Sequence, residues 1–552
     1  MAAHLFQMIG MAPVEGIVFR NDACNLHGTS SLRYLPVLYH ARAENGNGWE
    51  RMSPKSGKMS NQVLTFSTKW VYNSDSIPTL FPENGKIKRR SFGMKKFLSL
   101  VLAMLMVFGV TASLADDGAD LLAITTEEIT LRYATMGEDY ELTLDLAEQF
   151  MQAYPNIKVE IVEIDTGTYT EGLGNLAAEQ KLPDVFWMEN VCDAVGNDWA
   201  LRLDDYYTTD PDAARMDPAL LKMAQIAGRR YSIPAQTRPM MVVVNKTLFD
   251  KYNVELPGYD WTWEEFVQVC EAVAHPEDYY FGYGNNTTIE YFYNRHGWDG
   301  DSYEFDETWV MLEETFANWR ETGVADNMTA EEKEKILGDP NGFAAANGRV
   351  AVNGLSFIWG GAAYLDGSTA QETGCEYLLY PVPSPMEGNP DETIFACISK
   401  GTKYPNEAWL LGKWMTWGRE ATMLRNVWFE ENEVVQNSVP MLTDEDLWQH
   451  TIDHGNPGLA DFYANFKGIA PRIDPHAPNI IWCNVMFYFG GVPDSFANGT
   501  ATPADRAPSL REEMNGYRDN WYRDTSEFGA VPEFLQTATA TDLDVTTGTD
   551  AE

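Results

Sequence analysis

The chain has 552 residues, with 81 acidic and 40 basic side chains and a formal net charge of −41 at pH 7. A protein this negative repels nucleic acid and anionic membrane surfaces, so the composition excludes proteins whose main task is to bind either of them. The length is sufficient for two or three domains.

The start of the chain differs from the rest. Residues 1–93 have no sustained helical or strand period, and we interpret them as an upstream extension from a misassigned start. From Met94 a lysine pair, an apolar run and a small-x-small cleavage pattern follow in the order of a signal peptide, residues 94–115. The alternative is a twin-arginine export signal around Arg89 and Arg90. Both interpretations predict export.

Removal of the predicted signal peptide makes the charge more negative. The first 115 residues carry seven more basic than acidic side chains, so residues 116–552 have a net charge of −48. Such a field disfavours an anionic ligand and favours a polyamine or another cation.

The cysteines give no clear pattern. Six are spread over the whole chain, and five of them follow residue 115 at wide spacing, which is neither a disulfide framework nor a zinc pattern. One or two bridges remain an alternative in an oxidising compartment. Cys270 lies on the apolar face of a predicted helix, and we interpret it as a buried thiol.

Strands and helices are expected to alternate in the stretch 129–190. The elements are expected at Ile129–Ala134, Glu138–Tyr154, Ile157–Ile164, Tyr169–Gln180 and Asp184–Met188. The first, third and fifth are strands, and this order implies a parallel sheet. Because ligands bind beyond the carboxyl ends of such strands, Trp187, Glu189 and Asn190 are candidate ligand-binding residues.

Residues 228–257 predict a crossing from one lobe to another. Pro234 lacks the N–H that a sheet needs, so we expect it to end a strand or to lie in a crossing segment. The run MMVVVN, residues 240–245, is typical of a strand that is buried on both faces. Arg238 lies between them and is a further candidate for ligand binding.

The same segment carries a spaced motif. It consists of Gly228, Tyr231, Ile233 and Pro234, then Asn245-Lys246, then Leu248-Phe249, and finally Thr262-Trp263-Glu264-Glu265-Phe266. In order and spacing the chain resembles the family 1 extracellular solute-binding proteins, the sugar receptors of bacterial ABC importers. The resemblance extends from about residue 129 to about residue 536.

This resemblance implies a two-lobed α/β periplasmic-binding-protein fold, type II-like, with discontinuous lobes joined by a hinge. Lobe 1 is expected at 124–236 plus 384–430, and lobe 2 at 237–383 plus 431–536. Residues 537–552 are expected to be a disordered polar tail. Leu114, Ala115 and Asp116 stand where many such receptors have a lipobox cysteine, so membrane tethering is not expected from this position.

Aromatic residues are the positive signal for a sugar. Trp and Tyr faces cover the C–H face of a sugar ring, while amide, carboxylate and guanidinium groups hydrogen-bond its hydroxyls. The predicted stacking set is Trp187, Trp298, Trp359 and Trp482. The predicted polar set is Glu189, Asn190, Arg238, Tyr283 and Asn353.

Other notable residues are interpreted as structural. Thr262 and Glu265 predict a capping box for a helix over 263–274, which makes the tryptophans at its start packing residues. Asn406 is a predicted N-cap, and the helix that follows it carries three tryptophans for core packing.

The loop DGDSYEFDE resembles a calcium loop but lacks the required glycine, and we favour a hairpin. His450 and His454 are interpreted as an exposed helix end rather than metal ligands.

The sequence carries no catalytic motif, and no enzyme activity, cofactor or metal is expected. We predict a monomeric extracytoplasmic protein, periplasmic or cell-surface associated, that captures a carbohydrate and delivers it to the transmembrane subunits of an ABC permease. One alternative keeps the fold but binds a polyamine or another cationic solute. A second alternative is a secreted glycoside hydrolase, which needs two carboxylates at a fixed separation.

Overall fold

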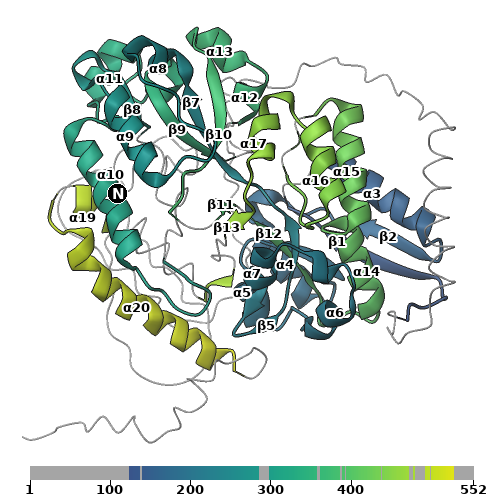
Figure 1. Cartoon of the computed structure of the whole chain (residues 1–552). Helices are drawn as coiled ribbons and strands as arrows, with labels where there is room; N and C mark the ends of the chain where they lie inside the picture. The colour runs from purple at the N-terminus through teal and green to yellow at the C-terminus, as the bar shows by residue number, and fades with distance from the viewer. Residues whose placement is uncertain are drawn as a thin grey trace, which may run out of the picture. The chain divides into compact units, whose positions relative to one another are not determined.

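In the computed structural model, the residues that can be described all lie within 118–552. The structure describes residues 123–136, 140–284, 297–356, 361–385, 388–391, 393–434, 436, 438–470, 476–478, 492–497 and 499–526. The fold is a mixed α/β architecture with two main sheets (Figure 1).

The first sheet has five strands in the order β2-β1-β3-β12-β6. They are β1 (Ile129–Ala134), β2 (Ile157–Ile161), β3 (Val185–Met188), β6 (Ile233–Gln236) and β12 (Ile394–Ile398). β1 pairs with β2 and β3 in parallel, and β12 pairs antiparallel with β3 and β6. The predicted parallel order of the first three strands is therefore confirmed, with α3 (Tyr140–Ala153) and α4 (Tyr169–Ala178) between them.

Two later helices complete this layer, α14 (Pro405–Met415) and α15 (Arg419–Asn432), both of which contact α3 (Figure 1). The predicted packing tryptophans of this region are confirmed, because Trp409, Trp414 and Trp417 are at most 5 % exposed. The N-cap prediction is wrong by two residues. Tyr404 is the N-cap of α14, and the side chain of Asn406 instead donates to the carbonyl of Ala123 and accepts from Tyr206.

The second sheet has four strands in the order β10-β7-β9-β8. They are β7 (Met240–Asn245), β8 (Phe281–Tyr283), β9 (Val350–Ser356) and β10 (Tyr377–Pro381). All six side chains of β7 are buried, as its continuous apolar run predicts. β7 lies between β10 and β9 in the sheet, and its side chains Met241 and Val243 pack against Val439, Leu459 and Phe462, so this face has to be apolar.

Helix α9 (Trp263–Val273) packs closely on the second sheet. Its predicted capping box is present, with Thr262 accepting from the backbone N–H of Glu265 and Glu265 accepting from that of Thr262. Gly282 of β8 is needed for this approach, since a Cβ there would lie 1.9 Å from the carbonyl oxygen of Cys270. Cys270 itself is fully buried, as predicted, and burial raises the pKa of its thiol.

The chain passes between the sheets twice. It leaves the first sheet at Gln236 and enters the second at Met240, and it leaves β10 at Pro381 and returns in β12 at Ile394. The prediction that Pro234 ends a strand or lies in a crossing segment is wrong. Pro234 lies inside β6, and β6 is an edge strand, where a missing N–H is tolerated.

A later segment contacts both sheets. Val439, Leu459 and Phe462 pack with residues of β7 and β10 in one apolar cluster. The same segment also contacts α7 (Pro218–Met223), where the backbone N–H of Asp217, the N-cap of that helix, donates to the carbonyl of Met441. The limits of the two predicted lobes stay a prediction.

The remaining helices are α5 (Val191–Gly196), α6 (Asp204–Thr209), α7 (Pro218–Met223), α8 (Lys246–Tyr252), α10 (Glu307–Thr322), α11 (Ala330–Leu337), α12 (Gly361–Leu365), α13 (Ser368–Thr373), α16 (Glu445–His454), α17 (Ala460–Ala464), α19 (Val492–Ala497) and α20 (Pro503–Asp524). Short strand pairs are β4 (Gln225–Ile226) with β5 (Arg229–Arg230), and β11 (Asn389–Pro390) with β13 (Ile469–Ala470). Within the described ranges, no helix combines the length and apolar character needed to cross a membrane.

Candidate functional site

The parallel strands of the first sheet define one edge where a ligand can bind. Because β1, β2 and β3 run in the same direction, their carboxyl ends lie at the same edge. Ligands of open α/β sheets bind beyond this edge. The residues that follow the strand ends there include Thr135, Glu163, Glu189 and Asn190.

Tyr140 and Glu163 form a polar–aromatic pair at this edge. Tyr140 is the first residue of α3 and is 45 % exposed, and Glu163 follows β2 by two residues. The hydroxyl of Tyr140 donates to Oε1 of Glu163 at 2.8 Å, and this hydrogen bond raises the pKa of Tyr140. An exposed ring face beside a carboxylate is chemistry that suits a sugar, with its C–H face and hydroxyls.

Sequence reasoning missed both members of this pair. The apolar stripe of α3 is formed by Leu146, Ala147 and Phe150, all of which are buried. Tyr140 lies off this stripe. An aromatic residue outside the apolar face of an amphipathic helix is a candidate for ligand binding, and this signal could have identified Tyr140 from the sequence. Glu163 carried no signal, since the sequence has many acidic residues and the predicted second strand extended over it.

Glu189 and Asn190 lie at the end of β3 as predicted. Glu189 is exposed, and Asn190 is half-buried. Asn190 is the N-cap of α5, where its Oδ1 accepts from the backbone N–H of Cys192 at 2.9 Å. Its side-chain oxygen therefore orients α5, while Glu189 presents its carboxylate to solvent.

Trp187 is an interior residue of the first sheet. Its side chain is 0 % exposed, and its Nε1 donates to the hydroxyl of Tyr133 at 2.6 Å. In this conformation the indole ring has no exposed face with which to stack on a sugar. A ligand contact of Trp187 stays a prediction.

Arg238 lies in the crossing between β6 and β7. It is 6 % exposed, and its Nε and Nη2 donate to Oε1 of Gln236 at 2.9 Å and 2.7 Å. Gln236 is the last residue of β6, so the edge of the first sheet positions this guanidinium.

Two predicted aromatic residues, Tyr283 of β8 and Trp298 beyond it, are buried. Tyr283 is 1 % exposed and packs between Phe316 and Trp319, with ring centroids 5.3 Å and 5.6 Å away. Trp298 is 3 % exposed and packs on Tyr303 with centroids 4.8 Å apart. Tyr283 and Trp298 therefore serve as core residues in the present conformation.

Asn353 is the predicted polar residue of β9. It is 5 % exposed, and its Oδ1 has no hydrogen-bond partner in the described part of the chain. β9 pairs with β8 so that Tyr283 lies opposite Val352, the neighbour of Asn353. Trp359 and Trp482 lie outside the described residues.

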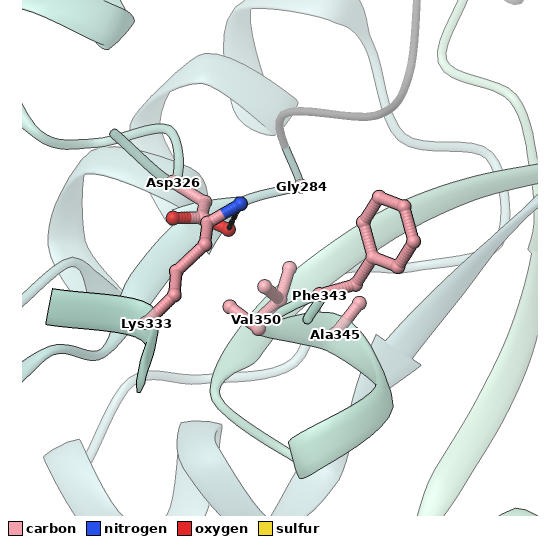
Figure 2. A pocket seen from close by; sticks show the side chains of 7 residues that line it. Gly284, Asp326, Lys333, Phe343, Ala345 and Val350 are labelled. Carbon is pink, nitrogen blue, oxygen red and sulfur yellow. Dashed lines mark ion pairs between the residues drawn. The ribbon is translucent and has the colours of Figure 1, made fainter. Parts of the chain in front are cut away.

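A small cavity lies beside the carboxyl end of β8, next to Gly284 (Figure 2). Its volume is about 80 Å³, and Asp326 and Lys333 line it as an ion pair with 3.9 Å between Nζ and Oδ2. Figure 2 shows the ammonium group directed at the carboxylate. Drug-sized ligands need roughly 300 Å³ or more, so this cavity alone is too small for an oligosaccharide.

The acidic loop after Trp298 is built as a turn. Oδ1 of Asp299 accepts from the backbone N–H groups of Asp301 and Ser302 at 2.8 Å and 2.9 Å, and Ser302 donates to Glu304. In the part of the chain that the structure describes, no three histidine, cysteine or carboxylate side chains gather as metal ligands. His454 ends α16, and His450 contacts Glu430 at 2.8 Å.

The cysteines of the described ranges are free thiols. Cys192, Cys270 and Cys397 are buried, and Cys375 is half-buried. Burial raises the pKa of the first three. These thiols are interior packing groups rather than reactive ones.

Comparison with known proteins gives a family and a fold. The family model of the bacterial extracellular solute-binding proteins matches residues 133–416. The sugar-binding protein MalE of Xanthomonas citri has 14 % identity and a TM-score of 0.57, with 72 % of this chain and 100 % of that chain covered. A sugar transporter of Rhizobium etli in an open conformation has 16 % identity and a TM-score of 0.56, covering 70 % and 99 %.

A third similar structure is a cyclo/maltodextrin-binding protein in complex with maltotetraose. It has 17 % identity and a TM-score of 0.52, with 71 % of this chain and 97 % of that chain covered. At these identities the likeness is one of fold, and it confirms the predicted two-lobed periplasmic-binding-protein architecture.

Proposed function

The chain belongs to the bacterial extracellular solute-binding proteins, and from this premise we propose that it is the substrate-binding component of an ABC transporter. It captures a carbohydrate of oligosaccharide length and delivers it to the transmembrane permease subunits. The protein acts outside the cytoplasm after removal of the signal peptide 94–115, and it acts as a monomer.

The observation that carries this proposal is the Tyr140–Glu163 pair at the carboxyl edge of the first sheet. The ring of Tyr140 offers its exposed face to the C–H face of a sugar, and Glu163 accepts from sugar hydroxyls. Glu189 contributes a second exposed carboxylate at the end of β3. Arg238 contributes donors from the crossing segment, where Gln236 holds it.

The binding cycle uses the two crossings as a hinge. The segments 237–239 and 382–393 connect the sheets, so a rotation of one sheet relative to the other is absorbed there. A ligand that contacts both lobes favours the closed conformation by its differential affinity for it. In that conformation Asn353, Trp359 and Trp482 join the ligand contacts from the second lobe.

A specific observation favours a second candidate ligand, a polyamine or another organic cation. The exposed side chains at the first sheet edge include two carboxylates, Glu163 and Glu189, and the exported chain has a net charge of −48. Carboxylates bind ammonium groups as well as sugar hydroxyls. The glycoside hydrolase alternative is not retained, because the family is one of solute-binding proteins.

A thermal-shift screen tests the proposal and separates the two ligands. The purified chain is heated with maltooligosaccharides, xylooligosaccharides, monosaccharides and spermidine, because a ligand that binds the folded state raises the melting temperature. A dose-dependent shift with one sugar series supports the carbohydrate receptor. A shift with spermidine alone would overturn the choice of ligand, and no shift with any sugar would contradict the proposal.

A further inference from the structure

A small cavity lies between β6, α15 and residues 436 and 438–441. Its lining comes from the end of β6, from four residues between 416 and 426, and from residues 436 and 438–441, and every lining residue is at least nine-tenths buried. The cavity leaves about 10 Å³ for the centre of a water-sized sphere. It adjoins the crossing between the sheets, since Thr237 donates to the carbonyl of Val439 at 2.8 Å.

One amide group in this lining lacks a partner. Asn426 is 3 % exposed, and its Nδ2 has no hydrogen-bond partner in the described part of the chain. Its Oδ1 accepts from Nε2 of Gln436 at 2.9 Å. A buried N–H donor without a partner costs about 1–3 kcal/mol, so native structures rarely keep one.

The orientation of this amide follows from its neighbours. Nε2 of Gln436 also donates to the carbonyl of Ser438, at 3.2 Å. Both contacts of this nitrogen are therefore to oxygen, which fixes the Gln436 amide. Turning the Asn426 amide over would place two NH₂ groups against each other, so Nδ2 of Asn426 is the group left over.

We propose that this cavity is a binding site for one buried water molecule, which accepts a hydrogen bond from Nδ2 of Asn426. A cavity needs roughly 10–15 Å³ on this measure to hold one water, and the water needs two to four polar partners. Thr422 and Ser438 also line the cavity, and a hydroxyl group of either residue is an acceptor of the kind that the water needs. Thr422 donates its own proton to the carbonyl of Gly418, at 3.2 Å, which leaves its lone pairs for the water.

The surroundings exclude a metal cation from this site. Arg425 lines the cavity and donates to the carbonyl groups of Met415 and Thr416 at the end of α14. The positively charged guanidinium group repels a cation, and an amide N–H is a hydrogen-bond donor that cannot coordinate one. A neutral molecule that accepts and donates hydrogen bonds satisfies the same lining.

The inference goes beyond the proposed function and does not depend on the ligand of the protein.

The experiment is a crystal structure of the unliganded full chain at a resolution that shows ordered waters, together with Asn426→Leu. We expect one density peak in the wild type at about 2.7–3.2 Å from Nδ2 of Asn426. In Asn426→Leu, where the new side chain is apolar and similar in size, we expect the peak to be absent and residues 436 and 438–441 to keep their positions.

Three results would overturn the proposal. They are a wild-type cavity without density, a direct protein partner for Nδ2 of Asn426, or a peak that is unchanged in Asn426→Leu. The wild-type result stands by itself if the variant fails to fold. None of these results bears on sugar binding, which the thermal-shift screen measures separately.

Discussion

Two tyrosines at the sheets of this molecule have opposite roles. Tyr140, at the edge of the first sheet, is 45 % exposed and hydrogen-bonded to Glu163, whereas Tyr283, at the end of β8 in the second sheet, is 1 % exposed. The difference lies in what covers them. α9 and α10 bring Phe266 and Phe316 onto Tyr283, while Tyr140 begins a helix whose apolar face points elsewhere. An aromatic residue near a strand end is therefore a ligand candidate only where no helix packs over it.

The first way to test this comparison is to truncate a buried aromatic. Trp187→Ala removes a fully buried indole that donates to Tyr133, so we expect the free energy of unfolding to fall by about 3–5 kcal/mol. Denaturant unfolding of wild type and variant measures this, with Trp187→Phe as the control of smaller effect. Unchanged stability together with lost sugar binding would show that Trp187 is a ligand residue instead.

The second test uses pH on an interior group. His476 is buried against Phe395 and contacts the hydroxyl of Ser232 at 2.8 Å, and burial lowers its pKa to about 3. The folded state therefore prefers the neutral imidazole, and the stability present above pH 6.5 is lost as the pH falls toward 3.

Between pH 6.5 and 4.5 this group alone should lower the free energy of unfolding by roughly 2–3 kcal/mol, at 1.36 kcal/mol for each pH unit. His476→Gln should lack this component, so the difference between wild type and variant should shrink over that interval. Parallel stability curves for the two proteins would contradict the burial of His476.

The third test addresses the exposed tyrosine. Tyr140→Ala should weaken binding of the best sugar by roughly tenfold, which is about 1.4 kcal/mol, because it removes the stacking face. The free energy of unfolding should change by less than about 0.5 kcal/mol, since the side chain is a surface one. Leu144→Ala is the matched control, because Leu144 is 38 % exposed one turn further along α3. A loss of the same size in both variants would remove Tyr140 from the site.

The smallest effect is expected for Glu163→Gln. The amide keeps an acceptor oxygen but loses the charge, so affinity for a neutral sugar should change by less than about threefold, which is under 1 kcal/mol. For a cationic solute the same change should cost much more, since a charge-assisted bond is lost. Titration calorimetry of this variant with a sugar and with spermidine therefore sharpens the choice between the two ligands.

Periodicity predicted the first layer well. The strand Ile129–Ala134 is confirmed residue for residue, and α9 begins at the capping box that Thr262 and Glu265 predict. These elements are set by local pattern and by caps that lie within a few residues. The misplaced break at Pro234 has a different cause, because an edge position depends on which strand pairs with β6, and that is not a local property.

The site was harder to predict than the fold. Trp187 and Tyr283 follow the aromatic pattern of a sugar site, yet whether such a ring is exposed depends on the helices that pack over it. Tyr140 and Glu163 lie 23 residues apart, and only the parallel pairing of β1 and β2 brings them together. The motif over residues 228–266 identified the family. Tyr140 and Glu163 lie outside this motif, so the motif could not locate the pair.

The most direct test of the Tyr140–Glu163 site is a crystal structure of the chain with the sugar that gives the largest thermal shift. We expect a sugar ring in van der Waals contact with the ring of Tyr140 and a sugar hydroxyl that donates to Glu163. A sugar bound elsewhere, with Tyr140 and Glu163 still exposed to solvent, would contradict it.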